Sequence, residues 1–150
     1  MVLYLFNSMI LPLDFDLYRL VSVKMQRIEV AEATALLGNR KWVSAIGHES
    51  TASFMSGILG VPIYPNRKTI FMRPGDSGLH FFLKKRLPEG TVLGLAHLEK
   101  MRYWFVMSEI ASVAGKAGKE TSVDAMSSSR GDETHTETSR LSKYTNAVKR

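Results

Sequence analysis

A histidine in a polar turn is the residue of this chain best suited to acid–base chemistry. His48 follows a predicted strand, residues 42–46, and precedes a predicted helix, within the stretch Ile46-Gly47-His48-Glu49-Ser50-Thr51. Imidazole titrates near neutral pH, which suits a general acid or a general base. The first N–H groups of a helix lack intrahelical partners, so this turn can also bind an anion.

The neighbours of this histidine support an anion site. Ser50 is the expected N-cap of the helix, with Thr51 assisting. Gly47 permits a close approach of a backbone or a phosphate. A lone histidine is, however, more often structural than catalytic, and a capping role requires only the serine.

Two arginines lie where predicted strands meet loops, a common position for functional residues in α/β proteins. Arg67 follows the turn at residues 64–66, and Arg86 ends the run Lys84-Lys85-Arg86. The guanidinium group matches the geometry of phosphate oxygens. A solvated basic face is the alternative interpretation, and it is favoured for the two lysines.

The sequence predicts no metal site and no cofactor. The chain has no cysteine, so thiolate ligands and disulfides are excluded. The remaining histidines cluster neither with one another nor with carboxylates; they are His80, His97 and His135.

The composition favours anionic partners. Lysine and arginine number 20 against 14 acidic residues in 150, a formal charge of +6, and the pI is about 9.7. Nucleic acids, nucleotides and membrane surfaces all fit this balance. No apolar run reaches the length of a membrane span, so we expect no membrane crossing and no membrane partner. The absence of cysteine fits a reducing compartment, and we expect a cytoplasmic protein.

The chain divides by composition near residue 111. Residues 1–111 hold both tryptophans, all seven phenylalanines and four of the five tyrosines, whereas the segment that follows is rich in Ser, Thr, Gly and mixed charge. Such a segment buries too little apolar surface to offset its ordering entropy. We therefore predict one folded domain, 1–111, and a disordered tail, 112–150.

Short β-branched and aromatic runs predict strands, and apolar periodicity predicts helices. We expect a small α/β domain with a mixed central sheet flanked by helices. A dense turn signal at 73–78 predicts that the strands on either side of it form a hairpin. The predicted strands are Val2–Phe6, Leu20–Met25, Trp42–Ile46, Lys68–Met72, Leu79–Lys84 and Tyr103–Met107; the predicted helices are Ile28–Leu37, Ser50–Leu59 and Ala96–Met101.

Four sequence features together resemble one known family. They are Val2-Leu3-Tyr4-Leu5-Phe6-Asn7, Ile46-Gly47-His48-Glu49-Ser50-Thr51, Pro65-Asn66-Arg67 and Arg86-Leu87-Pro88-Glu89-Gly90. This series resembles the viral ring nucleases, the type III anti-CRISPR enzymes of archaeal viruses, with relatives in phages and mobile elements. The resemblance covers residues 1–110, and the tail has no counterpart in it.

The resemblance implies a small α/β homodimer that binds cyclic tetra-adenylate and cleaves it to linear di-adenylate without a metal, which would block type III CRISPR signalling. If so, the protein acts in the cytoplasm of an infected host. Carried over to this chain, the catalytic residues are His48, Arg86 and Glu89, and the ligand-binding residues are Asn7, Gly47, Ser50, Thr51 and Arg67.

The chain departs from the family pattern at four places. The family commonly has Asp at the position of Glu49, Gln at that of Lys85 and a second acid at that of Pro88. The serine usually found a few residues after the asparagine is absent, with Ile10 near its place. The last departure affects ligand contact more than catalysis.

Two other function classes fit the same sequence. A basic homodimeric regulator that binds DNA or RNA would show steeply salt-dependent binding and indifference to His48. A protein that sequesters cyclic oligonucleotides without cutting them would need the two arginines but not the histidine. Phe81, Trp104 and Phe105 offer apolar surface either for a dimer interface or for the core.

Overall fold

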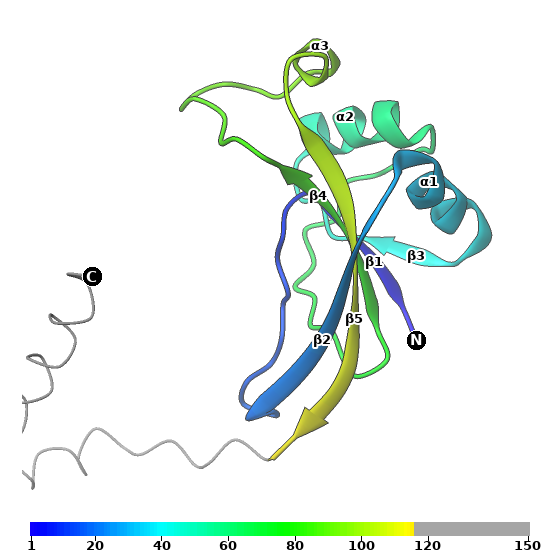
Figure 1. The fold of residues 1–150 in the computed structure, drawn as a ribbon, viewed down its shortest axis with the longest axis vertical. Helices are drawn as coiled ribbons and strands as arrows, with labels where there is room; N and C mark the ends of the chain where they lie inside the picture. Colours follow the sequence, from blue (N-terminus) through cyan, green and yellow to red (C-terminus); the bar gives the residue numbers. More distant parts are fainter. Residues whose placement is uncertain (116–150) are drawn as a thin grey trace, which may run out of the picture. The chain divides into compact units, whose positions relative to one another are not determined.

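The computed structural model describes residues 1–115, which form one small domain with a five-stranded mixed sheet and helices (Figure 1). The predicted α/β class is confirmed. The strands are β1 (Leu3–Phe6), β2 (Leu20–Ile28), β3 (Trp42–Ser44), β4 (Ser77–Leu83) and β5 (Tyr103–Ala114), and the helices are α1 (Val30–Asn39), α2 (Glu49–Leu59) and α3 (Leu95–Leu98).

The sheet has the strand order β2-β5-β4-β1-β3. Strand β1 pairs in parallel with both β3 and β4, so three neighbouring strands point the same way. Strand β5 pairs antiparallel with β4 and with β2. The carboxyl ends of β4, β1 and β3 therefore meet at one edge of the sheet, where binding sites of such sheets are usually located.

Alternating side chains of β1 serve two separate apolar clusters. Leu3 and Leu5 pack in the larger cluster with residues of α1 and α2, which cover one face of the sheet. Phe6 packs in the smaller cluster with Met72 and Leu13, which belong to connecting segments on the other face. This alternation follows from the period of two in a strand.

The predicted strand Lys68–Met72 is wrong, and so is the hairpin that it was expected to form. The segment makes a single bridge, between Met72 and Leu13. Both edges of β4 are occupied, by β1 on one side and by β5 on the other, so no edge is left for residues 68–72. The turn itself is present: Asp76 N–H donates to the carbonyl of Arg73 at 2.9 Å.

All three helices differ from their predicted bounds. Helix α1 begins at Val30 instead of Ile28, because Ile28 is the last residue of β2, and α2 begins at Glu49 instead of Ser50. Gly38-Asn39 does not stop α1, which runs through both residues and ends at the extended residue Arg40. The short helix α3 covers Leu95–Leu98 instead of Ala96–Met101. Helix α2 ends as predicted, because Gly60 adopts the left-handed conformation with φ 65°.

Strand β5 continues to Ala114, three residues beyond the boundary that composition placed at 111. Its partner β2 is also longer than predicted and pairs with β5 along its whole length. The rest of the predicted tail, from residue 116, lies outside the described residues. Among the described helices, none combines the length and the apolar character that a membrane crossing demands.

Candidate functional site

The three parallel strands deliver the predicted site residues to one edge of the sheet. Asn7 follows the end of β1, and His48 is the last residue of the four-residue connection between β3 and α2. Arg86 comes shortly after the end of β4. Three segments far apart in the sequence thus meet because their strands are neighbours and run in parallel.

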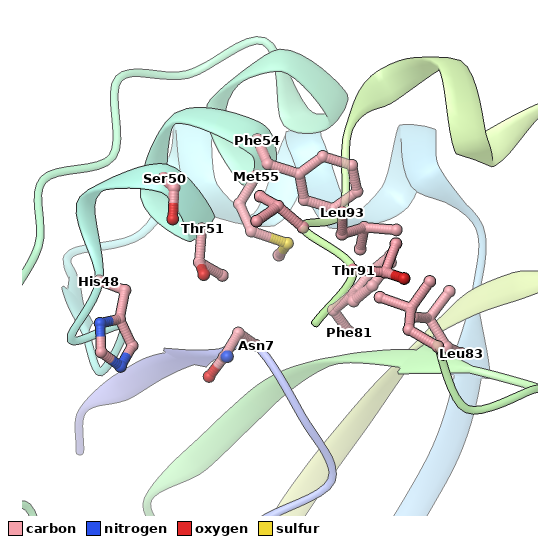
Figure 2. Close-up of a pocket in the computed structure, with 12 residues that line it drawn as sticks. Asn7, His48, Ser50, Thr51, Phe54, Met55, Phe81, Leu83, Thr91 and Leu93 are labelled. Atoms are coloured by element: carbon pink, nitrogen blue, oxygen red, sulfur yellow. The ribbon is translucent and has the colours of Figure 1, made fainter. Parts of the chain in front are cut away.

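A cavity of about 390 Å³ opens at this edge, between α2 and the ends of β1 and β4 (Figure 2). Its polar end carries Asn7, His48, Ser50 and Thr51. Its apolar end is formed by side chains from α2, β4 and the segment after β4: Phe54, Met55, Phe81, Leu83, Leu87, Val92 and Leu93, with Thr91 beside them. Such a division suits a ligand with one charged and one apolar part.

Two further cavities adjoin the first because they share lining residues with it. The second, of about 470 Å³, shares Asn7 with the first and adds Lys85 and Arg86. The third, of about 390 Å³, shares His48 with the first and adds Arg67 and Lys68.

The charges around the three cavities all have one sign. Four cationic side chains line them, namely Arg67, Lys68, Lys85 and Arg86. Within the described chain, none of the three is lined by an aspartate or a glutamate. This arrangement favours an anionic ligand that extends over several cavities.

His48 is the N-cap residue of α2, in place of the predicted Ser50. Its backbone is extended, with φ −111° and ψ 134°, and its carbonyl accepts the first helical hydrogen bond, from Ala52 N at 2.9 Å. No side chain caps the helix. Ser50 and Thr51 lie in the first turn, so their backbone N–H groups and hydroxyls stay available to a ligand at the polar end of the cavity.

The loop before this helix is fixed from the other side by the segment that carries Arg67. The Asn66 backbone N–H donates to the carbonyl of Ile46 at 2.8 Å, and its side-chain Nδ2 donates to that of Ser44 at 2.7 Å. Arg67 Nε donates to the carbonyl of Gly47 at 3.1 Å. Arg67 is thereby oriented through Nε, which leaves its two Nη groups for a ligand.

Gly47 lies beneath Arg67. A Cβ atom at Gly47 would meet Arg67 Cγ at 3.8 Å, an ordinary van der Waals distance. The packing of the protein therefore does not require glycine at position 47. The close approach of a phosphate, which the sequence suggested for this glycine, concerns a bound ligand.

Glu89 is the predicted site residue that the structure does not bring to the others. It is exposed in the turn at 88–91, where Thr91 N donates to the carbonyl of Pro88, and it lines none of the three cavities. This turn lies in the segment between β4 and α3, which projects beyond the sheet (Figure 1).

A buried histidine beside the site was missed in the sequence. His80 has no exposed surface, and its ring stacks on Phe6 with centroids 4.9 Å apart. Its Nδ1 lies 3.2 Å from the carbonyl oxygen of Ser8 and its Nε2 lies 2.7 Å from Ser108 Oγ. A carbonyl oxygen only accepts, so Nδ1 carries the proton and Nε2 accepts from the serine hydroxyl. Burial lowers the pKa of His80, which favours this neutral form.

His80 matters for the site because it holds the turn that follows Asn7. The carbonyl of Ser8 also accepts from Ile10 N at 2.9 Å, so the turn after Asn7 is fixed by two hydrogen bonds. Ser8 and Met9 of this turn line the second cavity. Because Ser8 directly follows Asn7, its position next to a predicted site residue was the feature of the sequence that could have identified it.

Among residues 1–115, no three His, Cys, Asp or Glu side chains are grouped so that they could hold a metal ion. The polar groups at the cavities are one imidazole, the amides of Asn7 and Asn66, four hydroxyls and four cations. This set can bind phosphate groups and transfer a proton.

Known proteins resemble the chain in sequence and in fold. The STIV B116-like family model matches residues 3–105. Uncharacterized protein 26 of Sulfolobus islandicus filamentous virus is 38% identical over 112 residues, which is 74% of this chain and 93% of that protein. Uncharacterized protein ORF117 of Acidianus two-tailed virus is 38% identical over 94 residues, 61% of this chain and 78% of that protein.

Similarity extends to a bacterial protein and to a solved structure. Uncharacterized protein YddF of Bacillus subtilis is 40% identical over 67 residues, 45% of this chain and 62% of that protein. The structure of B116 of Sulfolobus turreted icosahedral virus shares the fold, with a TM-score of 0.57 and 20% identity over 73% of this chain and 99% of that one. The chain belongs to the STIV B116-like family, which includes proteins of viruses.

Proposed function

We propose that this protein is a metal-independent phosphodiesterase that cleaves cyclic tetra-adenylate to linear di-adenylate and so interferes with type III CRISPR signalling. The observation that supports the proposal best is the set of three adjoining cavities. They hold one exposed histidine, four cations and no carboxylate from the described chain. A small ring with several phosphates matches both the charge and the extent of this surface.

The chemistry follows from what the substrate itself supplies. Each ribose of an RNA ring carries a 2′-hydroxyl next to the phosphate, so the nucleophile belongs to the substrate. In the proposed reaction, the 2′-hydroxyl gives up its proton to a base, Glu89 or solvent water, as the 2′-oxygen attacks phosphorus, and the bond to the 5′-oxygen breaks. His48 donates a proton to the departing 5′-oxygen. The same step at two opposite phosphates divides the ring into two linear di-adenylates. Each carries a 2′,3′-cyclic phosphate, which water opens to a 3′-phosphate in a later step.

The cations act on the charge that develops at phosphorus. Arg86 stabilises the phosphorane oxygens, and Arg67 and the first turn of α2 hold neighbouring phosphates. Glu89 orients His48 or assists deprotonation. Because Glu89 lines no cavity of its own subunit, we propose that it acts from the partner subunit of a homodimer.

A homodimer also matches the symmetry of the ring. Cyclic tetra-adenylate has two-fold symmetry, and a C2 dimer presents each site twice about the same axis. Two copies of His48, Arg67 and Arg86 would then surround one ring. The small number of cations in one chain is thereby doubled.

The test is cleavage of radiolabelled cyclic tetra-adenylate in the presence of EDTA. The wild-type protein is expected to convert the ring to linear di-adenylate. His48→Ala should slow this conversion about 10²–10⁴-fold, the usual contribution of a general acid. His97→Ala is the matched control, because His97 is exposed and lines none of the three cavities.

The alternative outcomes separate the competing functions. If His48→Ala cleaves at the wild-type rate, the proposed mechanism is wrong. Tight binding of the ring without any conversion identifies a protein that sequesters it. If the ring neither binds nor reacts, while DNA or RNA binds with a steep salt dependence, the basic surface serves polynucleotides.

A further inference from the structure

A row of stacked side chains crosses the open face of the sheet and ends at the second cavity. The guanidinium carbon of Arg27, on β2, lies 5.6 Å from the ring centroid of Trp104, on β5. The ring of Trp104 stacks on that of Phe82, on β4, with centroids 5.2 Å apart and an interplanar angle of 25°. Phe82 is the last ring of the row, and it lines the cavity.

The register of the sheet explains this row. Phe82 and Trp104 are directly paired residues of β4 and β5, so their side chains stand next to each other on one face. Arg27 stands on the neighbouring strand β2, diagonal to Trp104. Glu29 accepts a hydrogen bond from Arg27 at 3.3 Å, which holds the guanidinium group from its solvent side.

These two rings are not part of the core. Neither Phe82 nor Trp104 belongs to either of the two apolar clusters, and both are half-buried. Phe81 and Phe105, their immediate neighbours in sequence, point to the other face and are buried there. A pair of large aromatic surfaces left partly open on a sheet is costly in water, and nucleobases are the flat ligands that commonly cover such surfaces.

The rest of the cavity supplies what a nucleotide needs besides a ring. Ser8 and Met9, of the turn that His80 fixes, line the same cavity as Phe82. Lys85 and Arg86 line the same cavity and carry the positive charge for a phosphate. The volume, about 470 Å³, exceeds that of a purine base and leaves room for its ribose.

We propose that the second cavity is a nucleobase subsite, in which a purine continues the stack of Trp104 and Phe82 while Arg86 binds the adjoining phosphate. This inference rests on the proposed function and assigns a place within that site to one base of the ring. Stacking is tolerant of base identity, and a purine offers the larger surface. The subsite therefore selects for an aromatic base and favours adenine over uracil.

The test uses mononucleotides, so it does not depend on cleavage. Dissociation constants are measured for AMP, UMP and ribose 5-phosphate, which carry the same phosphate with a purine, a pyrimidine or no base. We expect AMP to bind about 5- to 150-fold more tightly than ribose 5-phosphate, with UMP between them. Phe82→Leu should remove this preference, and Phe82→Tyr, which keeps the ring, should retain it.

Phe71→Leu is the matched control, since Phe71 is 51% exposed and lines none of the three cavities. It should leave the AMP preference unchanged.

The subsite is disproved if AMP and ribose 5-phosphate bind the wild type equally, or if Phe82→Leu keeps the preference. If the preference depends on Phe82 but cyclic tetra-adenylate is not cleaved, the subsite stands and the proposed nuclease function fails. If cyclic tetra-adenylate is cleaved but AMP and ribose 5-phosphate bind equally, the nuclease function stands and the subsite fails.

Discussion

His48 and His80, the two histidines at and beside the site, differ in their surroundings and therefore in the roles that they can have. His48 is exposed at the N-terminus of α2, where it can exchange a proton with a ligand. His80 is fully buried between Ser8 and Ser108, where both ring nitrogens are already engaged. The first is suited to catalysis and the second to holding the turn after β1.

The burial of His80 predicts a pH dependence of folding. Its pKa is lowered in the folded state, so the unfolded chain, with a histidine pKa near 6.5, binds the proton first as the pH falls. The neutral, buried His80 therefore contributes its full stabilisation of the folded state above about pH 6.5. This contribution is lost progressively as the pH falls from that value toward the pKa of His80 in the folded state. Its slope is at most about 1.4 kcal/mol per pH unit.

The variant His80→Asn isolates this contribution. Asparagine can still donate to the carbonyl of Ser8 but does not titrate. The difference in unfolding free energy between wild type and variant, from urea denaturation, should shrink as the pH is lowered from 7 to 5. Parallel profiles over that range would show that His80 does not titrate as its burial requires.

At the scale of elements, the site exists because β4, β1 and β3 are adjacent and parallel. Each strand ends in a segment that lines at least one of the cavities. The centre of this arrangement is tightly packed: a Cβ atom at Gly78 would lie 2.5 Å from His80 Nε2 and 2.8 Å from Ser108 Oγ. Glycine is thus required at this position of β4 to make room for the buried histidine.

Two glycine substitutions should therefore act in opposite directions. Gly78→Ala is expected to destabilise the domain by about 1–3 kcal/mol, the usual cost of overpacking. Gly38→Ala should stabilise it by up to about 1 kcal/mol, because Gly38 lies within α1 with no atom within 4 Å of the added Cβ. Unfolding free energies from urea denaturation compare the two. An equal effect of both alanines would contradict the packing described for β4.

The sequence was sufficient to predict most elements and the residues that gather around His48. Composition and periodicity identified β1, β5 and the two longer helices, and they indicated the α/β class. The family resemblance named Asn7, Ser50, Thr51 and Arg67, all of which line a cavity together with His48. The elements and the motifs that carry the resemblance are local, since each depends on neighbours within a few residues.

What the sequence did not reveal depends on pairing between distant segments. Residues 68–72 have the composition of a strand, but only the strand order shows that both sides of β4, their predicted partner, are already paired. The stack of Phe82 on Trp104 depends on the register of β4 and β5. The position of Glu89 outside the cavities depends on the course of the segment between β4 and α3, for which the sequence holds no local signal.

At the scale of the whole molecule, the proposed function requires two copies of the chain. In that proposal one subunit would supply His48 and the cations, and its partner would supply Glu89. Light scattering should therefore give a mass of about twice the 16.8 kDa chain at micromolar concentration. A mass of one chain that persists when cyclic tetra-adenylate is added would contradict the dimeric site.

In the proposed reaction, this chain opens a cyclic tetra-adenylate ring by using the ring's own 2′-hydroxyl. The most direct measurement is the mass spectrum of the nucleotides formed when the wild-type protein and the ring are incubated in EDTA. At early times we expect a di-adenylate of half the ring's mass, because each of the two cuts forms a 2′,3′-cyclic phosphate and adds no water. A ring that stays intact after prolonged incubation, or a first di-adenylate heavier than half the ring by one water, would contradict cleavage by the 2′-hydroxyl.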